Sequence, residues 1–316
     1  MQTRTLGQSD LQLAPLVLGG NVFGWTADQA TSFSILDAFV DGGGNTIDTA
    51  DGYSVWVPGH VGGESETIIG QWLKQRGRRD DVIIATKVGW EVDADHKGLK
   101  KDYIQRAVEG SLRRLNTDYI DLYQSHKDDP TTPVEETLGA YAELVQAGKV
   151  RVIGASNFSA ARLRESLEAS AKHGLPRYES LQPLYNLYDR AEFEHDLLPL
   201  VREQNIGVIP YYGLAAGFLT GKYRTEADLQ KSARGGGVGQ KYLNEKGLRI
   251  LAVLDVVAAR HQATPAQVAL AWLLAQPGLT APIASATSPE QVTELLGATE
   301  LALSSEDLGQ LSAASA

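Results

Sequence analysis

The feature that most constrains the fold is an alternation of short apolar runs with amphipathic stretches of helical length. Apolar residues recur with helical period over residues 65–75, 101–115, 133–147 and 159–172. Strands that alternate with helices form a parallel sheet, because each helix returns the chain to the same end of the sheet. The predicted strands are residues 16–19, 45–48, 82–87, 120–124, 150–155, 180–183, 207–210 and 281–285.

Eight such units are the number that closes a (β/α)8 TIM barrel, and we predict this α/β fold for residues 1–316 as a single domain. A doubly wound sheet is the alternative, since it needs no particular number of strands. Residues 2–6 and 10–14 alternate between polar and apolar around a Gly-Gln-Ser turn, which predicts a β-hairpin cap at the N-terminus. We interpret the glycine-rich residues 234–239 as part of a long mobile βα loop.

Composition and charge narrow the classes of function. The chain has 29 Lys and Arg against 39 Asp and Glu, a net charge of −10, which argues against nucleic acid and against an anionic membrane surface as partners. It has no cysteine, which excludes disulfides, thiolate metal sites and cysteine nucleophiles. No signal-peptide pattern and no long apolar run occur in the sequence, so we expect a cytoplasmic protein with a small-molecule partner. The oligomeric state is left open.

Polar residues end consecutive predicted strands. Asp48 ends the second strand and leads into Tyr53, while Lys87 ends the third strand and His126 the fourth. Only the rim at the strands' carboxyl ends is open in such a barrel, so we expect these side chains to converge there. A phenol ordinarily titrates near pH 10, so Tyr53 needs a cation such as Lys87 to lower its pKa, with Asp48 holding the lysine. The set suits protonation of a carbonyl oxygen as a hydride arrives, or the reverse.

Each of these residues also has a plainer interpretation. Asp48 could cap a loop, and His126 could be an ordinary buried histidine. A metal-dependent barrel enzyme is a further alternative, although a lysine among the carboxylates would compete with the metal, and we predict no metal. Its ligands would be Asp48, Asp51, His126, Asp128 and Asp129.

Several longer motifs resemble those of the aldo-keto reductase family. They follow the family order and span nearly the whole chain. The matching stretches are residues 45–53 (NTIDTADGY), 84–87 (IATK), 118–126 (DYIDLYQSH), 129–133 (DPTTP), 148–158 (GKVRVIGASNF), 182–186 (QPLYN) and 217–223 (GFLTGKY).

This resemblance implies that Asp48, Tyr53, Lys87 and His126 form a catalytic tetrad, with Tyr53 as general acid in reduction and general base in oxidation. It implies a nicotinamide cofactor across the rim, and an enzyme that interconverts aldehydes or ketones with alcohols. The cofactor positions that it implies are Gly20, Asn21, Asp48, Ser156, Asn157, Gln182, Tyr211, Gly213, Leu214, Gly217, Lys222, Ser285, Thr287, Gln291 and Glu294.

The sequence departs from the family pattern at the positions expected to contact the cofactor's 2′-phosphate. Members often carry a cation among the positions of Ser285, Thr287 and Gln291, all of which are neutral here. NADP(H) is favoured on family grounds, and NAD(H) stays open. Lys222, Arg224 or Arg234 could instead reach the phosphate from the long loop.

Aromatic residues on the predicted rim loops favour a substrate whose carbonyl is carried on an apolar or ring-shaped body. We expect Phe23, Trp25, Trp56 and Trp90 in its pocket, with residues 54–63 as a lid or a plain exposed loop. The sequence is also similar to channel-associated β subunits that share the barrel, so a regulatory subunit with little or no catalysis is the alternative function. The sequence indicates neither the substrate nor the physiological direction.

Overall fold

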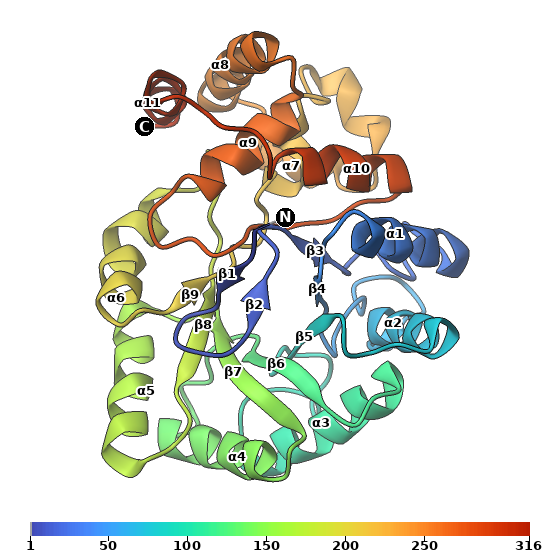
Figure 1. Cartoon of the computed structure of the whole chain (residues 1–316), viewed down its shortest axis with the longest axis vertical. Coiled ribbons are helices and arrows are strands. Elements are labelled where there is room, and N and C mark those ends of the chain that lie inside the picture. The colour runs from blue at the N-terminus through green and yellow to red at the C-terminus, as the bar shows by residue number, and fades with distance from the viewer. Residues whose placement is uncertain (1) are drawn as a thin grey trace.

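A computed structural model describes residues 2–316 and contains a curved sheet of eight parallel strands (Figure 1). The neighbours in the sheet run β10-β3-β4-β5-β6-β7-β8-β9, so from β3 to β9 each strand pairs with the next one along the chain. The strands are β3 (Val17–Gly19), β4 (Thr46–Asp48), β5 (Ile83–Val88), β6 (Ile120–Ser125), β7 (Val150–Ser156), β8 (Tyr178–Gln182), β9 (Gly207–Val208) and β10 (Ile283–Ala284).

The two edge strands meet and close the sheet. The backbone N–H of Thr280 donates to the carbonyl of Val208 at 2.8 Å, and that of Ile283 donates to the carbonyl of Pro210 at 2.9 Å. On the other side of β10, the N–H of Val17 donates to Pro282 at 3.0 Å. The predicted (β/α)8 barrel is therefore confirmed, and the doubly wound alternative is wrong.

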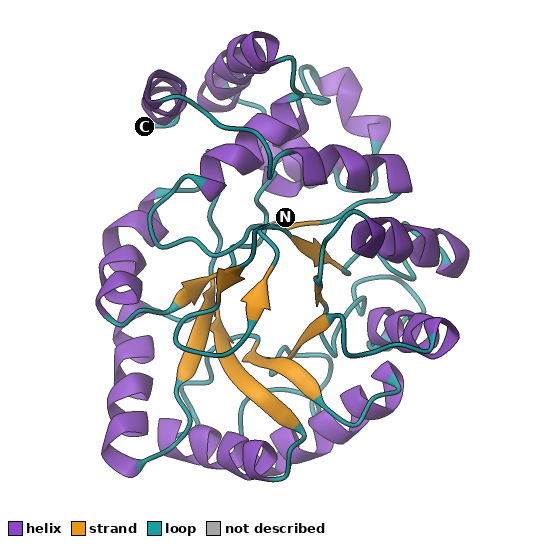
Figure 2. Ribbon diagram, in the orientation of Figure 1, coloured by secondary structure: helices purple, strands orange, loops and turns teal. Residues whose placement is uncertain are grey.

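Helices surround the strands as an outer layer (Figure 2). The predicted helix over residues 101–115 is α3, with the same bounds, and it has a strongly one-sided apolar face that packs on the sheet. The helices are α1 (Gln29–Asp41), α2 (Glu64–Arg76), α3 (Lys101–Leu115), α4 (Val134–Gln146), α5 (Ala160–His173), α6 (Leu198–Glu203), α7 (Gly235–Tyr242), α8 (Glu245–His261), α9 (Pro265–Leu274), α10 (Pro289–Gly297) and α11 (Ser305–Ala314).

The predicted hairpin is present and covers the amino end of the barrel. It consists of β1 (Arg4–Thr5) and β2 (Gln12–Leu13), which pair antiparallel. The Asn45 side chain ties it to the start of β4, donating to the carbonyl of Gln12 and accepting from the N–H of Ala14, both at 2.8 Å. Its leucines fill the barrel's interior at this end. The apolar cluster there comprises Leu6, Leu11, Leu13, Val17, Ala85, Leu122, Val152, Ile209, Ala281 and Ile283.

The glycine-rich segment is the clearest correction to the sequence analysis. Residues 234–239 are not an irregular loop, because Gly235 begins helix α7. A Cβ on Gly235 would lie 1.6 Å from the carbonyl oxygen of Leu229, and one on Gly239 would lie 2.4 Å from the Leu229 side chain. These glycines allow α7 to pack closely on the short 3₁₀ helix Glu226–Lys231, a tertiary requirement that outweighs their low helix propensity.

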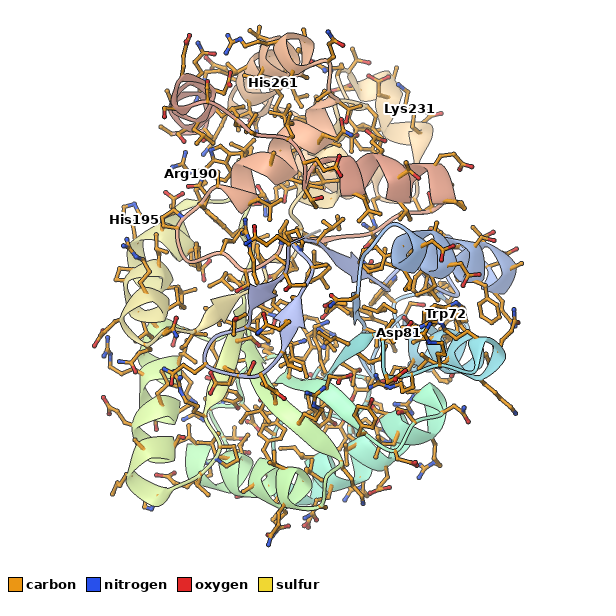
Figure 3. All side chains as sticks on the ribbon, viewed as in Figure 1. Trp72, Asp81, Arg190, His195, Lys231 and His261 are labelled. Atoms are coloured by element: carbon orange, nitrogen blue, oxygen red, sulfur yellow. The ribbon has the colours of Figure 1, made fainter. Side chains whose placement is uncertain are left out.

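Polar contacts between helices stabilise the outer layer at positions distant from the strand ends. Trp72 of α2 donates its indole N–H to Asp37 of α1 at 2.7 Å. In α8, Arg260 contacts Asp307 of α11, and His261 Nε2 lies 2.9 Å from the same carboxylate. Figure 3 labels Trp72 and His261, which both lie in this helical layer. Within residues 2–316, none of the helices is both long enough and apolar enough to cross a membrane.

Candidate active site

Strand register brings the polar strand ends to one level of the barrel. Asp48 of β4 pairs with Gly19 of β3 and Ala85 of β5. Lys87 of β5 lies opposite Gln124 of β6. Because the strands are parallel, all of these positions lie near the carboxyl end of the barrel, opposite the hairpin.

The predicted lysine–aspartate pair is present and buried. Lys87 Nζ lies 2.6 Å from Asp48 Oδ2, and the exposed fractions of the two residues are 0% and 2%. The same ammonium donates to the carbonyl of Thr49 at 2.8 Å and to Tyr53 Oη at 3.1 Å. The three N–H donors of Lys87 are thus all engaged, and its charge is directed at the phenol.

The ionisation of this group follows from burial and charge together. Burial lowers the pKa of Lys87, but the Asp48 carboxylate and the hydrogen bonds outweigh this effect, so the pKa lies above its ordinary value. Burial raises the pKa of Tyr53 above 10.0, and Lys87 only partly opposes the rise. The predicted net lowering of the Tyr53 pKa is therefore wrong for the isolated chain, because desolvation of the phenolate exceeds its attraction to Lys87.

His126 lies next to the phenol. Its ring centroid is 5.7 Å from that of Tyr53, and its Nδ1 is buried with no hydrogen-bond partner among residues 2–316. Burial lowers the pKa of His126 well below 6.5, and the nearby charge of Lys87 lowers it further. The imidazole is therefore neutral at neutral pH.

The residues expected around a carboxamide form one hydrogen-bonded chain. Ser156 Oγ donates to the carbonyl of Gln182 at 2.9 Å, and Asn157 Nδ2 donates to the carbonyl of His126 at 2.9 Å. Tyr211 Oη donates to Asn157 Oδ1 at 2.8 Å. This chain joins the carboxyl ends of β7 and β8 to the segment after β9.

Sequence reasoning missed Gln124. Gln124 Nε2 donates a hydrogen bond to Asp48 Oδ1 at 3.2 Å inside the barrel. The sequence does contain a signal for this contact, because Gln124 is a polar residue in a buried strand, two positions after Leu122. In a strand, this spacing points both side chains to the same side, here into the barrel.

The expected phosphate and adenosine positions lie around β3, β10 and the start of α10. Ser285 Oγ donates to Asn21 Oδ1 at 2.7 Å, and the N–H of Gly20 donates to the carbonyl of Asp48 at 2.7 Å. The N–H of Thr287 donates to Gln291 Oε1 at 2.9 Å. Of the other expected positions, Leu214, Gly217 and Lys222 belong to the segment after β9, Gly213 is buried beside the carbonyl of Ile283, and Glu294 lies in α10.

The cations of the long loop differ in their surroundings. Arg224 makes a two-pronged ion pair with Asp255, with both distances 2.7 Å. The guanidinium of Arg234 lies 5.2 Å from the ring centroid of Trp25, and its Nη2 is buried without a hydrogen-bond partner among residues 2–316. A half-buried guanidinium with one nitrogen unpartnered in the described part of the chain and a set of amide side chains fit a dinucleotide, which presents phosphates and a carboxamide.

The expected pocket residues divide into two groups. Trp56 and Trp90 are 46% and 41% exposed. The ring centroid of Trp56 lies 5.5 Å from that of Tyr53, and the centroid of Trp90 lies 5.0 Å from that of His126. Trp25 lies 5.8 Å from Trp56. Phe23, in contrast, is fully buried.

The loop over residues 54–63 is held by one carboxylate. Glu64 accepts hydrogen bonds from the backbone N–H groups of Val61 at 2.8 Å and of Ser54 and Gly62 at 3.1 Å. Ser54 Oγ also lies 2.9 Å from His60 Nδ1. The loop that carries Trp56 is therefore anchored at both ends.

The carboxylates of the metal hypothesis have other contacts. Asp128 pairs with Arg162 at 2.8 Å, and Asp129 accepts the N–H of Leu99 at 2.9 Å. Asp51 is buried with Oδ1 unpartnered among residues 2–316, and burial raises its pKa to about 7. Among the residues described, no cluster of three or more His, Cys, Asp or Glu side chains could hold a metal ion.

Comparison with known proteins adds the family. The profile of the Aldo/keto reductase family matches residues 15–316. An uncharacterized oxidoreductase, YrpG, of Bacillus subtilis is 36% identical over 98% of this chain and 95% of its own. The aldo-keto reductase YhdN of the same organism is 36% identical over 95% of this chain and 87% of its own. A probable voltage-gated potassium channel subunit beta of Arabidopsis thaliana is 33% identical over 95% of this chain and 92% of its own.

Proposed function

This chain belongs to the aldo-keto reductase family, and on that premise we propose that it interconverts a carbonyl compound and an alcohol by hydride transfer, with Tyr53 as the proton donor and acceptor. The observation that carries the proposal is the buried Lys87 ammonium, 2.6 Å from Asp48 and 3.1 Å from the Tyr53 phenol. A structural ion pair does not need a phenol as its third partner.

Tyr53 moves the proton in this mechanism. In reduction its hydroxyl gives a proton to the carbonyl oxygen, and Lys87 stabilises the phenolate that results. Asp48 keeps Lys87 charged and fixes its direction. In oxidation the phenolate takes the proton back from the alcohol.

His126 orients the carbonyl. Because its imidazole is neutral, it can donate a hydrogen bond from one ring nitrogen without giving up its proton at neutral pH. We therefore assign orientation of the carbonyl to His126 and transfer of the proton to Tyr53.

The proposed cofactor is a nicotinamide dinucleotide, as the family generally uses NAD(P)H. When bound, it supplies the hydride in reduction and accepts it in oxidation. Ser156, Asn157 and Gln182 would hold its carboxamide and Tyr211 would pack on its ring, while the loop from Leu214 to Lys222, Ser285 to Gln291 and Glu294 would hold the rest.

NADP(H) is the proposed cofactor on family grounds, with NAD(H) as the competitor. Ser285, Thr287 and Gln291 are neutral, and Arg224 is already neutralised by Asp255. Lys222 and Arg234 are the cations that could still meet a 2′-phosphate.

A ring-bearing carbonyl compound is the proposed substrate class. The half-exposed faces of Trp56 and Trp90 flank Tyr53 and His126, and a planar or apolar ring would cover them.

A regulatory subunit is the second candidate, because the Arabidopsis channel subunit aligns over nearly all of this chain. Turnover separates the two proposals. A regulatory subunit would bind dinucleotide and reduce carbonyl compounds weakly or not at all.

The decisive variant is Tyr53→Phe, which removes the phenolic proton and little else. We expect it to lower carbonyl reduction by at least a hundredfold while cofactor affinity, read by protein fluorescence, changes less than twofold. The matched control is Tyr119→Phe, since Tyr119 lies outside the site against Arg79. Near-full activity in Tyr53→Phe would refute the proposed role of Tyr53.

A further inference from the structure

The loop that carries Trp56 is closed by a single side chain. Glu64, the first residue of α2, accepts a hydrogen bond from the N–H of Val61 through Oε1 at 2.8 Å. Its Oε2 accepts hydrogen bonds from the N–H groups of Ser54 and Gly62, both at 3.1 Å. Ser54 lies at the start of the loop and Gly62 near its end, so one carboxylate holds the two ends together.

The remaining backbone hydrogen bonds of this loop are local. Within residues 2–316, the bonded backbone N–H groups of residues 55–60 donate to carbonyls three positions earlier. Ser54 is fully buried, so removal of the carboxylate would leave its N–H without an acceptor. Partial burial raises the pKa of Glu64, but hydrogen bonds from backbone N–H groups such as that of Val61 outweigh this effect and hold the pKa below its ordinary value. The carboxylate is therefore charged at neutral pH.

Glu64 also contacts the turn that carries Trp25. A Cβ on Gly24 would lie 3.2 Å from Glu64 Cβ, so this turn packs directly on the Glu64 side chain. The ring centroids of Trp25 and Trp56 lie 5.8 Å apart, and the Trp56 centroid lies 5.5 Å from that of Tyr53. One side chain thus supports both segments that place tryptophans at the entrance to Tyr53.

Tyr53 is held by contacts of its own. Its N–H donates to the carbonyl of Ala50 at 3.2 Å, its carbonyl accepts the N–H of Gly63 at 2.9 Å, and Lys87 Nζ donates to its hydroxyl at 3.1 Å. Loss of the Glu64 carboxylate therefore loosens the loop more than it loosens the phenol.

We propose that Glu64 is a positioning residue that determines substrate specificity: it holds the loop closed and keeps the Trp56 ring beside Tyr53, where that ring binds the ring of an aromatic carbonyl compound. This inference rests on the proposed function, and it assigns the preference for a ring-bearing substrate to a residue that touches neither substrate nor cofactor. A small aliphatic aldehyde can reach Tyr53 without covering Trp56, so its binding does not depend on the loop.

The test compares the binding of benzaldehyde and propanal to the whole chain by calorimetric titration. Saturating NADP⁺ is present, so no hydride is available and the titration measures affinity alone. In Glu64→Ala, we expect benzaldehyde to bind roughly fivefold more weakly, which corresponds to the loss of one aromatic contact, while the affinity for propanal changes less than about twofold. In turnover with NADPH, kcat for each aldehyde should stay within about twofold of the parent value, because Tyr53 keeps its own contacts.

Three further variants complete the test. Glu64→Gln, whose single carbonyl oxygen can keep at most two of the three hydrogen bonds, should give a smaller loss, and it carries the test if the alanine variant does not fold. Trp56→Ala should weaken benzaldehyde binding as much as Glu64→Ala does, and the double variant no further, because both act through one ring. The matched control is Glu135→Ala, which removes an exposed carboxylate from the first turn of α4 and should change neither affinity.

The failures of the two proposals are distinguishable. The role of Glu64 alone is overturned by unchanged benzaldehyde binding in a folded Glu64 variant, by equal weakening of both aldehydes, or by additive losses in the double variant with Trp56→Ala. A parent protein that binds benzaldehyde with this dependence on Glu64 but reduces neither aldehyde overturns the proposed reaction and supports the role of Glu64. A parent protein that binds neither aldehyde overturns both proposals.

Discussion

The two ends of the barrel are built on opposite principles. At the amino end, Leu6, Leu11 and Leu13 of the hairpin fill the interior with apolar contacts. At the carboxyl end, the interior holds an ammonium, a carboxylate and two amides, with buried atoms of His126 and Arg234 that have no partner among residues 2–316. Apolar packing fills the first end, whereas the second is held by hydrogen bonds and ion pairs and leaves these two atoms without a partner in that part of the chain.

The largest effect should come from Lys87→Met at the carboxyl end. The change leaves Asp48 buried without its cation, which costs about 3–5 kcal/mol in the free energy of unfolding, and it removes the charge that stabilises the Tyr53 phenolate. We expect kcat/KM to fall roughly a thousandfold. Urea unfolding and carbonyl reduction measure the two effects.

A matched control is Lys101→Met, which removes an exposed lysine paired with Glu143. It should cost less than about 1 kcal/mol and leave activity intact. Equal effects in the two variants would contradict the special position of Lys87.

Leu13→Ala tests the other end of the barrel. Leu13 is fully buried, so its truncation should cost about 2–5 kcal/mol of unfolding free energy. Well below the unfolding midpoint, kcat should change less than twofold, because no polar contact at the carboxyl end depends on this residue. A large loss of kcat in the folded variant would show that the two ends are coupled.

Asp51 should impose a pH dependence on stability. Its pKa rises from 3.8 to about 7, mainly through burial and with a contribution from Glu66, so the folded state holds this proton more tightly than the unfolded chain. This contribution to stability is complete below about pH 4 and is lost as pH rises through 7, by at most about 1.4 kcal/mol per pH unit.

Replacing Asp51 by Asn should remove that slope, so that the variant gains stability relative to the parent protein between pH 5 and pH 8. Thermal unfolding across this range measures the difference. Parallel curves for the two proteins would argue against a protonated Asp51 at neutral pH.

The smallest effect concerns cofactor choice. Thr287→Arg places a cation at an exposed neutral position and retains the backbone hydrogen bond to Gln291. We expect the preference for NADPH over NADH to rise roughly tenfold in fluorescence titrations. Thr293→Arg adds the same charge farther along α10 and should leave the preference unchanged, which separates a specific contact from a general change in charge.

Much of the carboxyl end could be predicted from the sequence, because its polar residues follow apolar runs. Asp48, Lys87 and His126 each end such a run, and strand register alone brings them together. The helix at residues 101–115 followed equally from its periodicity. The single domain over residues 1–316 and the roles of the cofactor positions stay predictions.

The features that could not be predicted from the sequence depend on contacts between residues that are distant in the chain. The glycines of α7 are helical because Leu229 leaves no space for a Cβ. Gln124 gains its partners only when β4 and β8 lie beside it in the barrel. The net shift in the pKa of Tyr53 required the depth of its burial, which residue spacing does not give.

The N-terminal hairpin also has a consequence for the order in which the chain acquires its structure. Gln8 contacts Glu179 and Gln204 across 171 and 196 positions, and Leu6 packs against the cluster that includes Ile209 and Ala281. During synthesis on the ribosome, the hairpin therefore emerges long before the residues that receive it. Such distant contacts form slowly, because a large loop must close first. We therefore expect the hairpin to dock last, after the first strands of the barrel have assembled.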